Sequence, residues 1–339
     1  MKKKSTTLRD VANSCGVSAT AVSLTLNDKP SNLSDKTKQL IIETANKLGY
    51  RPDLTAQSLA TKKTNTIGVI IPDISNAFFS EAVRHIQIEL SMYGYDIFLC
   101  NSEEKFENDV KYLELFLSRN VDGLILTMSA ESMTLENQKR IKNIINESKT
   151  PYVLFDRYYN GDASKVFVDN EASGYDIAKH LIDQGHKRIG IITGPLVLNS
   201  SKDRLSGVIR AMKEHNLTLD EKHIFTGQYD METGKKGARK LLNQVSAIFA
   251  FNDLQAFGVI ESAKEMGIKI PNDVSLVGFD DIFYASILET KLTTVRQPIF
   301  EMSKELAKLI VHMIKDPNYQ ANKRMKATLI KRESVKKID

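Results

Sequence analysis

The fold of the amino-terminal part of this chain is decided by residues 7–27, which read TLRDVANSCGVSATAVSLTLN. Their first apolar residues recur with the i, i+3, i+4, i+7 spacing of one helical face, namely Leu8, Val11, Ala12 and Cys15. Gly16 then allows a sharp turn, and Ser18 is a favoured residue for starting a second helix. Two short helices joined in this way are typical of a helix-turn-helix unit.

A third helix is predicted after Ser34, and it ends at Gly49. In a helix-turn-helix unit the second helix enters the major groove of DNA. We expect its core side to carry Val22 and Leu26. The side chains expected to face the base edges are Ala19, Thr20, Ser23 and Leu24. Leu24 has two interpretations, a core residue of a slightly rotated helix or an apolar contact to a thymine methyl group.

Positive charge is concentrated in this first part of the chain. Residues 1–66 contain eleven Lys and Arg against five Asp and Glu, whereas the remainder contains 36 basic and 37 acidic residues. Such asymmetry is typical of a head that binds a polyanion and is joined to a neutral body. The alternative is a basic segment that only aids solubility.

The body alternates short apolar runs with helical stretches, as at residues 66–71 and 247–251. Fully apolar strands between helices indicate parallel sheets covered on both faces. The alternation restarts near residue 188, so we predict an all-α head and an α/β body of two doubly wound subdomains. The predicted parts are a head at 1–52, a hinge helix and linker at 53–65, a first subdomain at about 66–163 and 294–325, and a second at about 164–293 and 326–339.

Polar and aromatic residues follow several of these strands. Ligands bind beyond the carboxyl ends of strands in open α/β sheets. Carboxylates, amides and guanidinium groups between aromatic rings suit a neutral polyol, because they pair with hydroxyls while the rings stack on C–H faces. Each residue alone also has a structural interpretation, such as a helix cap. The residues concerned are Asp73, Asn76, Phe78, Phe79, Asp156, Arg157, Arg204, Asn252, Asp253, Asp280 and Asp281.

The chain resembles the LacI/GalR family of bacterial repressors over almost its whole length. The motifs that carry the resemblance are Leu8-Arg9-Asp10-Val11-Ala12, Gly16-Val17-Ser18, Val22-Ser23, Leu26-Asn27 and Leu48-Gly49-Tyr50-Arg51-Pro52. It implies that the hinge forms a helix on operator DNA and inserts Leu59 into the minor groove as an apolar wedge. The alternative is a plain linker. Residues that complete the expected DNA-binding set are Thr7, Ser18, Asn27 and Tyr50.

The body resembles the periplasmic sugar-binding proteins, and the ribose-binding members in particular. Asn76-Ala77-Phe78-Phe79 is similar to their Asn-Pro-Phe-Phe loop, and Asp156-Arg157 is similar to their Leu-Asp-Arg strand end. The resemblance adds further sugar ligands at Arg204, Asn252, Asp280 and Gln297, with Tyr229 at an aromatic position. It implies a homodimeric repressor, like those of ribose operons, that a ribose-like sugar between the subdomains releases from a palindromic operator.

Two other functions remain open. Asp73-Ile74-Ser75-Asn76 is similar to catabolite-control regulators, whose co-repressor is a phosphorylated carrier protein. A sugar-binding transport or sensory protein is the third possibility. We expect no enzyme and no cofactor, because dinucleotide, phosphate-loop and zinc-protease motifs are missing and the histidines lack metal spacing. Without a long apolar run or an apolar amino-terminal segment, we expect a cytoplasmic, nucleoid-associated protein with no membrane partner.

Overall fold

The computed structural model describes residues 6–27, 29–51, 63–159 and 161–339. The chain forms two compact units, Met1–Thr64 and Asn65–Asp339. Most of the predicted hinge, including Leu59, lies outside the described residues. No helix in the described part combines the length and the apolar composition needed to cross a bilayer.

The head contains three helices, α1 (Leu8–Cys15), α2 (Ala19–Leu26) and α3 (Asp35–Lys47). Thr7 starts α1 with a reciprocal cap, because its backbone N–H donates to the Asp10 carboxylate at 2.8 Å and its hydroxyl accepts from the Asp10 N–H at 3.3 Å. Gly16 ends α1 with a φ angle of +64°. Ser18 caps α2. The helices enclose a small core of Val11, Ala12, Val22, Ile41 and Ala45, which confirms the predicted helix-turn-helix fold.

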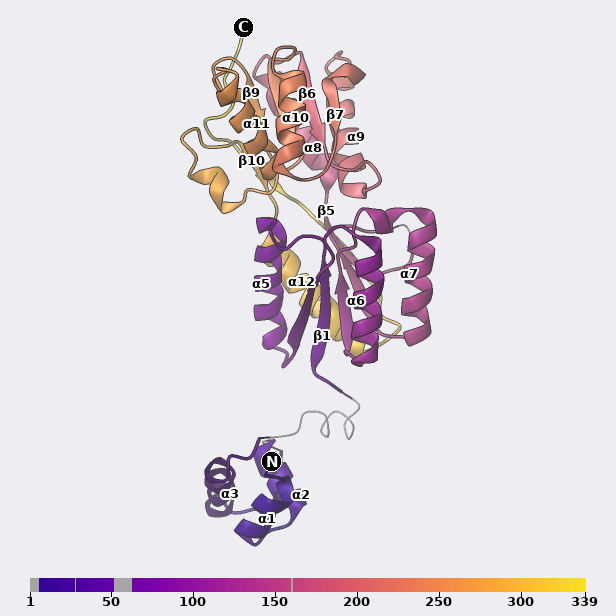
Figure 1. Ribbon diagram of the computed structural model, residues 1–339, viewed down its shortest axis with the longest axis vertical. Helices are drawn as coiled ribbons and strands as arrows, with labels where there is room; N and C mark the ends of the chain where they lie inside the picture. The colour runs from indigo at the N-terminus through magenta and orange to yellow at the C-terminus, as the bar shows by residue number, and fades with distance from the viewer. Residues whose placement is uncertain (1–5, 28, 52–62, 160) are drawn as a thin grey trace. The chain divides into compact units, whose positions relative to one another are not determined.

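The first subdomain of the body contains a six-stranded parallel sheet in the order β11-β5-β4-β3-β1-β2. Its strands are β1 (Thr66–Ile71), β2 (Asp96–Asn101), β3 (Gly123–Leu126), β4 (Tyr152–Phe155), β5 (Lys165–Val168) and β11 (Asn322–Met325). The covering helices are α5 (Ala77–Ser91) and α12 (Ile299–Lys315) on one face, and α6 (Phe106–Ser118) and α7 (Leu135–Ser148) on the other (Figure 1). A short helical turn, η1, spans Glu131–Met133.

The second subdomain has a four-stranded parallel sheet in the order β7-β6-β8-β9. Its strands are β6 (Ile189–Thr193), β7 (Ile224–Thr226), β8 (Ala247–Ala250) and β9 (Ser275–Val277). Its helices are α8 (Asn170–Asp183), α9 (Asn199–Glu214), α10 (Met231–Leu241) and α11 (Asp253–Glu265), with turns η2 (Glu221–His223) and η3 (Phe283–Ser286). An antiparallel pair, β10 (Thr294–Arg296) and β12 (Thr328–Ile330), completes the body. The predicted α/β architecture is therefore confirmed.

One predicted boundary needs correction. Residues 164–168 were expected in the second subdomain, but β5 pairs in parallel with both β4 and β11 in the first sheet. The chain therefore passes to the second subdomain after Val168, where α8 begins. The reason is that a short half-buried strand gains its backbone hydrogen bonds from the sheet that it extends.

Candidate functional site

A small cavity lies where strands of both subdomains reach their carboxyl ends. Its lining consists of Phe78, Phe79, Asp156, Arg157, Ser200, Arg204, Tyr229, Asn252, Asp280 and Gln297. The sequence pointed to all of these except Ser200, which lies in α9 and has no motif around it. The lining side chains leave about 20 Å³ of free space, room for about one water molecule. A larger ligand therefore requires the lining residues to move apart.

Two of the predicted asparagines serve as helix caps. Oδ1 of Asn76 accepts a hydrogen bond from the N–H of Phe78 at 3.0 Å and starts α5, and Asn76 does not line the cavity. Oδ1 of Asn252 accepts from the N–H of Gln255 at 2.9 Å and starts α11. Its Nδ2 donates to the carbonyl oxygen of Tyr229 at 3.1 Å. Asn252 lines the cavity, but its polar atoms already have partners.

Hydrogen bonds to α8 and to the residue that follows β8 fix the orientation of the Arg204 side chain. Its Nε donates to Oδ1 of Asn170 at 2.8 Å, and Nη1 donates to the carbonyl oxygen of Phe251. The guanidinium carbon lies 3.5 Å from the centre of the Phe279 ring. Helices α8 and α9 can approach this closely because Gly174 has no Cβ, which would overlap the Arg204 carbonyl group. Arg204 is therefore rigid before any ligand arrives.

Arg157 is fixed by residues from two other strand ends. Its Nη1 and Nη2 donate to the two carboxylate oxygens of Glu104 at 2.8 and 2.7 Å, and Nη1 also donates to the carbonyl oxygen of Met128 at 3.1 Å. Burial favours the neutral form of Arg157, but attraction to Glu104, the hydrogen bonds to Glu104 and attraction to Asp156 together outweigh burial and raise the pKa of the guanidinium group. Among the described residues, the Nε hydrogen and one Nη2 hydrogen have no partner.

Asp280 follows β9 and lies close enough to Arg204 for the two charges to attract each other. Its Oδ1 accepts a hydrogen bond from Nε2 of Gln297 at 2.7 Å. Burial raises the pKa of Asp280 to about 7, although Arg204 and the Gln297 hydrogen bond lower it. The carboxyl group therefore exchanges its proton near neutral pH.

Other strand-end acids have structural roles. Asp253 accepts hydrogen bonds from the Thr294 hydroxyl at 2.7 Å and from the N–H of Ile282 at 2.9 Å. Burial, and then repulsion from a neighbouring carboxylate, raises the pKa of Asp253. Asp73 accepts hydrogen bonds within its own turn, and Asp281 forms ion pairs with two arginines. These three residues do not line the cavity.

Two buried acceptor oxygens in the cavity wall have no hydrogen-bond partner among the described residues. They are Oδ1 of Asp156 and Oε1 of Gln297. An unpaired buried acceptor costs about 1–3 kcal/mol. Burial raises the pKa of Asp156, while Arg204 and Arg157 oppose that rise. Asp156 also has a φ angle of +61°, and strain of this kind is typical of ligand-binding sites.

Aromatic rings supply the apolar part of the wall. The Phe78 and Phe79 rings lie 5.0 Å apart, edge to face, at the start of α5. The Tyr229 hydroxyl lies 2.8 Å from Oγ of Ser201. Gly194 makes room for the Tyr229 ring, because a Cβ at that position would overlap it. The Tyr229 hydroxyl group thus contacts Ser201 of α9, and the Tyr229 ring lines the cavity.

This wall suits a small polyhydroxy molecule. The cavity wall combines three kinds of group: fixed guanidinium donors, unpaired carboxyl and amide acceptors, and aromatic faces. Within the described part of the chain, no group of three or more His, Cys, Asp or Glu side chains could hold a metal ion.

The predicted DNA-facing residues of α2 lie partly along a groove of about 510 Å³. Thr20 is exposed and Leu24 is half-buried, and both line the groove. The full lining is Ser18, Thr20, Ala21, Leu24, Pro30, Ser31, Asn32 and Leu33. Leu24 is half-buried and reachable from the groove, so its contact with DNA stays a prediction.

Other residues of the DNA-binding prediction have local structural roles. Ala19 and Tyr50 are half-buried and pack against the core of the head, so a base contact by Ala19 stays a prediction. The Thr7 side chain belongs to the α1 cap. Nδ2 of Asn27 donates to the carbonyl oxygen of half-buried Ser23 at 2.8 Å.

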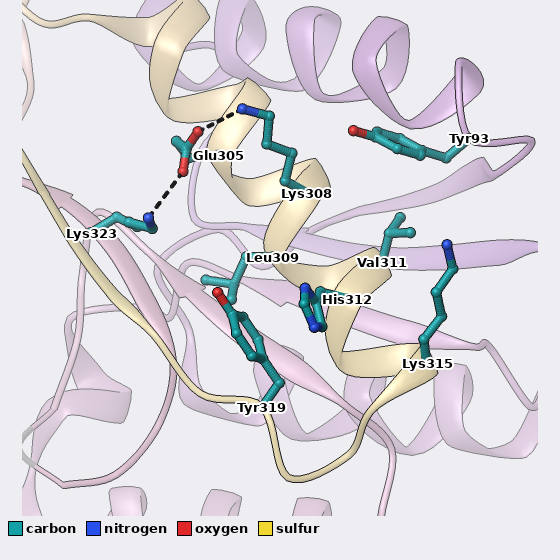
Figure 2. A pocket seen from close by; sticks show the side chains of 9 residues that line it. All are labelled: Tyr93, Glu305, Lys308, Leu309, Val311, His312, Lys315, Tyr319 and Lys323. Atoms are coloured by element: carbon teal, nitrogen blue, oxygen red, sulfur yellow. Dashed lines mark hydrogen bonds and ion pairs between the residues drawn. The ribbon is translucent and has the colours of Figure 1, made fainter.

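A second hollow of the body, about 670 Å³, lies along the carboxyl-terminal half of α12 (Figure 2). We call it the lysine groove, and its lining is Tyr93, Glu305, Lys308, Leu309, Val311, His312, Lys315, Tyr319 and Lys323. Glu305 lies between Lys308 and Lys323, at 3.0 and 3.4 Å. The Tyr319 ring stacks on His312 at 3.8 Å. No motif in the sequence predicts this groove, whose three lysines outnumber its single acid.

Comparison with known proteins gives consistent matches. Residues 7–53 match the model of bacterial regulatory proteins of the lacI family, and residues 178–335 match a periplasmic binding protein-like domain. The chain is 35% identical to the HTH-type transcriptional regulator DegA of Bacillus subtilis (strain 168), over 88% of this chain and 89% of that protein. It is 36% identical to catabolite control protein A of Priestia megaterium, over 90% and 91%. The crystal structure of a LacI family transcriptional regulator from Enterococcus faecium with bound ribose matches at a TM-score of 0.70 and 29% identity, over 81% of this chain and 100% of that chain.

Proposed function

Because the chain belongs to the lacI family of bacterial regulatory proteins, and is thus a DNA-binding transcriptional regulator, we propose that it represses a sugar-utilisation operon. In this proposal a ribose-like sugar binds between the subdomains and releases the protein from a palindromic operator. Its relatives are transcriptional regulators and not enzymes, so the site binds its ligand without converting it.

The observation that carries the sugar proposal is the pair of unpartnered acceptors, Oδ1 of Asp156 and Oε1 of Gln297. Both belong to the cavity wall, where a ligand or water can donate to them. Two hydrogens of Arg157 offer matching donors. A sugar hydroxyl both donates and accepts, so a polyol satisfies both kinds of group at once. The ribose-bound relative supports a pentose.

The charges of the wall favour a neutral sugar over a sugar phosphate. Glu104 neutralises Arg157, and two carboxyl groups, Asp156 and Asp280, face the remaining arginine, Arg204. A phosphate group would therefore meet no excess of positive charge. The wall lacks the cluster of free basic groups that phosphate recognition requires.

Regulation follows from the size of the cavity. The free space of about 20 Å³ is too small for a sugar, so the lining residues must move apart on binding; because these residues come from both subdomains, we propose that the arrangement of the subdomains changes. A ligand shifts a conformational equilibrium only by binding one state better than the other. Sugar and operator therefore weaken the binding of one another by the same factor.

The DNA-binding residues remain proposals. We assign base contacts to Thr20 and Leu24, because both line the groove beside α2. Leu59 lies outside the described residues, and its role as a minor-groove wedge rests on the family resemblance. The proposed wedge predicts that Leu59 supports specific binding more than non-specific binding.

We further propose that the protein acts as a homodimer through α5 and β2. The strand β2 lies at the edge of its sheet, and it exposes Phe98 by 49% and Leu99 by 39%. Ile88 and Met92 at the end of α5 are exposed by 42% and 70%. An exposed apolar edge strand is usually covered in stable proteins. A second copy of the chain fits, because a palindromic operator requires two heads.

The test is a calorimetric titration of the intact protein with D-ribose, D-ribose 5-phosphate and cellobiose. We expect saturable heat with D-ribose and none with the other two. Asp156→Asn should reduce the affinity for D-ribose by about tenfold or more, because one charged acceptor is lost. Absence of binding for every neutral monosaccharide tested would remove the sugar proposal.

A second candidate function is a catabolite-control regulator whose DNA binding is promoted by a phosphorylated carrier protein. The lysine groove favours it, since three lysines and one glutamate line it and the chain is 36% identical to a catabolite control protein. Lys308→Glu should then abolish binding of the phosphorylated carrier and leave D-ribose binding unchanged. Equal binding of the unphosphorylated carrier would argue against this candidate.

A further inference from the structure

Glu104 does not line the cavity, yet it connects the loops that follow four neighbouring strands. Its backbone N–H donates to the carbonyl oxygen of Pro72 after β1 at 3.1 Å. Its Oε2 accepts from the N–H of Ala130 after β3 at 2.9 Å. The same carboxylate accepts both fork hydrogen bonds of Arg157 after β4. Glu104 itself follows β2, so this one residue, through its backbone N–H and its carboxylate, connects the loops at the edge of the sheet where the cavity begins.

The local geometry of Glu104 is unusual. Glu103 and Glu104 have φ angles of +54° and +58°, and two consecutive non-glycine residues in the left-handed region are strained. Burial raises the pKa of Glu104, but attraction to Arg157 and the hydrogen bonds from Arg157 and Ala130 outweigh it and lower the pKa. The carboxylate is therefore ionised, and its side chain is 34% exposed while that of Arg157 is 3% exposed.

We propose that Glu104 is a positioning residue for sugar binding, which fixes the plane of the Arg157 guanidinium group and keeps its two remaining N–H donors available to the ligand. The proposal rests on the sugar-binding function above. A bidentate pair sets the orientation of a guanidinium group more strictly than a single hydrogen bond does.

Glu104 also protects an acceptor of the cavity. Arg157 is adjacent in sequence to Asp156, whose Oδ1 has no partner among the described residues and which attracts Arg157. Without the Glu104 carboxylate, the buried charge of Arg157 would pair with Asp156 instead. That pairing would remove one donor and one acceptor from the sugar site together.

The first test compares Glu104→Gln with a matched control, Glu131→Gln. Glu131 belongs to the same group of loops and accepts a hydrogen bond from the N–H of Phe106 at 2.9 Å, whereas its carboxylate has no recorded contact with Arg157 in the described residues. Calorimetry should show D-ribose affinity at least about tenfold weaker in Glu104→Gln. Glu131→Gln should bind as the native protein does, and Glu104→Asp should recover part of the loss.

A double-mutant cycle tests whether Glu104 acts through Arg157. The double variant Glu104→Gln with Arg157→Lys should bind D-ribose no more weakly than Arg157→Lys alone, because the lysine has no fork to orient. Additive losses would show that Glu104 acts independently, and they would overturn the proposal.

A crystal structure of sugar-free Glu104→Gln gives a readout that does not depend on ribose. We expect the guanidinium group of Arg157 to have turned from Met128 toward Asp156, and an unchanged Arg157 would overturn the proposal. If Arg157 turns but the native protein binds no D-ribose, the positioning role stands and the proposed ligand is wrong. If the native protein and Glu104→Gln bind D-ribose equally, the ligand stands and the positioning role fails.

Discussion

At the scale of single residues, Asp280 links ligand binding to stability. An aspartate ordinarily ionises near pH 3.8, whereas burial raises the pKa of Asp280 to about 7 in the folded protein. A raised folded-state pKa means that Asp280 favours the folded state in acid. This contribution is lost as the pH rises from about 4 to about 7. Above pH 7 the sugar-free protein therefore contains a buried charge that opposes folding.

Asp280→Asn should accordingly stabilise the sugar-free protein at pH 8. The gain in free energy of unfolding should be about 3 kcal/mol smaller at pH 5, where Asp280 is protonated in the folded protein. Urea titrations at both pH values measure this difference. The same variant should bind D-ribose about tenfold more weakly or worse, because a charged acceptor is lost.

The control for this prediction is Asp176→Asn, which changes an exposed carboxylate on α8. It should alter neither the stability nor the affinity. If Asp280→Asn raised the free energy of unfolding equally at pH 5 and at pH 8, that result would contradict a pKa of about 7 for Asp280.

The sequence points to most of the cavity wall, because parallel strands end at one edge of a sheet and residues such as Asp156 and Asp280 directly follow such strands. It could not separate ligands from caps, since Asn76 and Asn252 follow strands in the same way. It missed Glu104 for a physical reason: the contact with Arg157 depends on how four loops pack, and no local spacing encodes that packing.

At the scale of elements, the α8–α9 pair sets the position of Arg204. Gly174→Ala should push these helices apart, because the new Cβ meets the Arg204 carbonyl group. We expect a loss of about 1–3 kcal/mol in stability and a clear loss of D-ribose affinity. Gly258→Ala is the matched control, since its Cβ meets the backbone of α10 far from Arg204 in sequence. The Gly258→Ala variant should lose about as much stability as Gly174→Ala but keep its affinity for D-ribose.

The helix α2 should determine which operator the protein selects. Thr20→Ala should change the preferred base at one position of each half-site, because Thr20 is exposed and lines the groove beside α2. Sequencing of bound DNA selected from a random pool measures this preference. An unchanged consensus, with unchanged salt dependence, would reject α2 as the recognition helix.

Elements differ in how well a sequence encodes them. The caps at Ser18 and Ser34 set the starts of α2 and α3 as predicted, because each cap bonds only to its own first turn. The strand β5 was assigned to the wrong subdomain, because its sheet depends on pairing with β11, which lies far along the chain.

At the scale of the whole molecule, the proposed dimer makes operator binding depend on an exposed apolar surface. Phe98→Asp should convert the protein to monomers and weaken operator binding strongly, because a single head contacts only one half-site. Sedimentation equilibrium gives the mass, and the body should stay folded because Phe98 is 49% exposed. A dimer that survives Phe98→Asp and Leu99→Asp together would place the interface elsewhere.

The central claim is that one molecule couples a sugar in the body to an operator at the head. The most direct test selects bound DNA from a random duplex pool with and without D-ribose, using the intact protein. We predict that a palindrome is enriched without D-ribose and lost when D-ribose is present. A palindrome enriched equally in both samples would keep the DNA-binding function and contradict release by ribose.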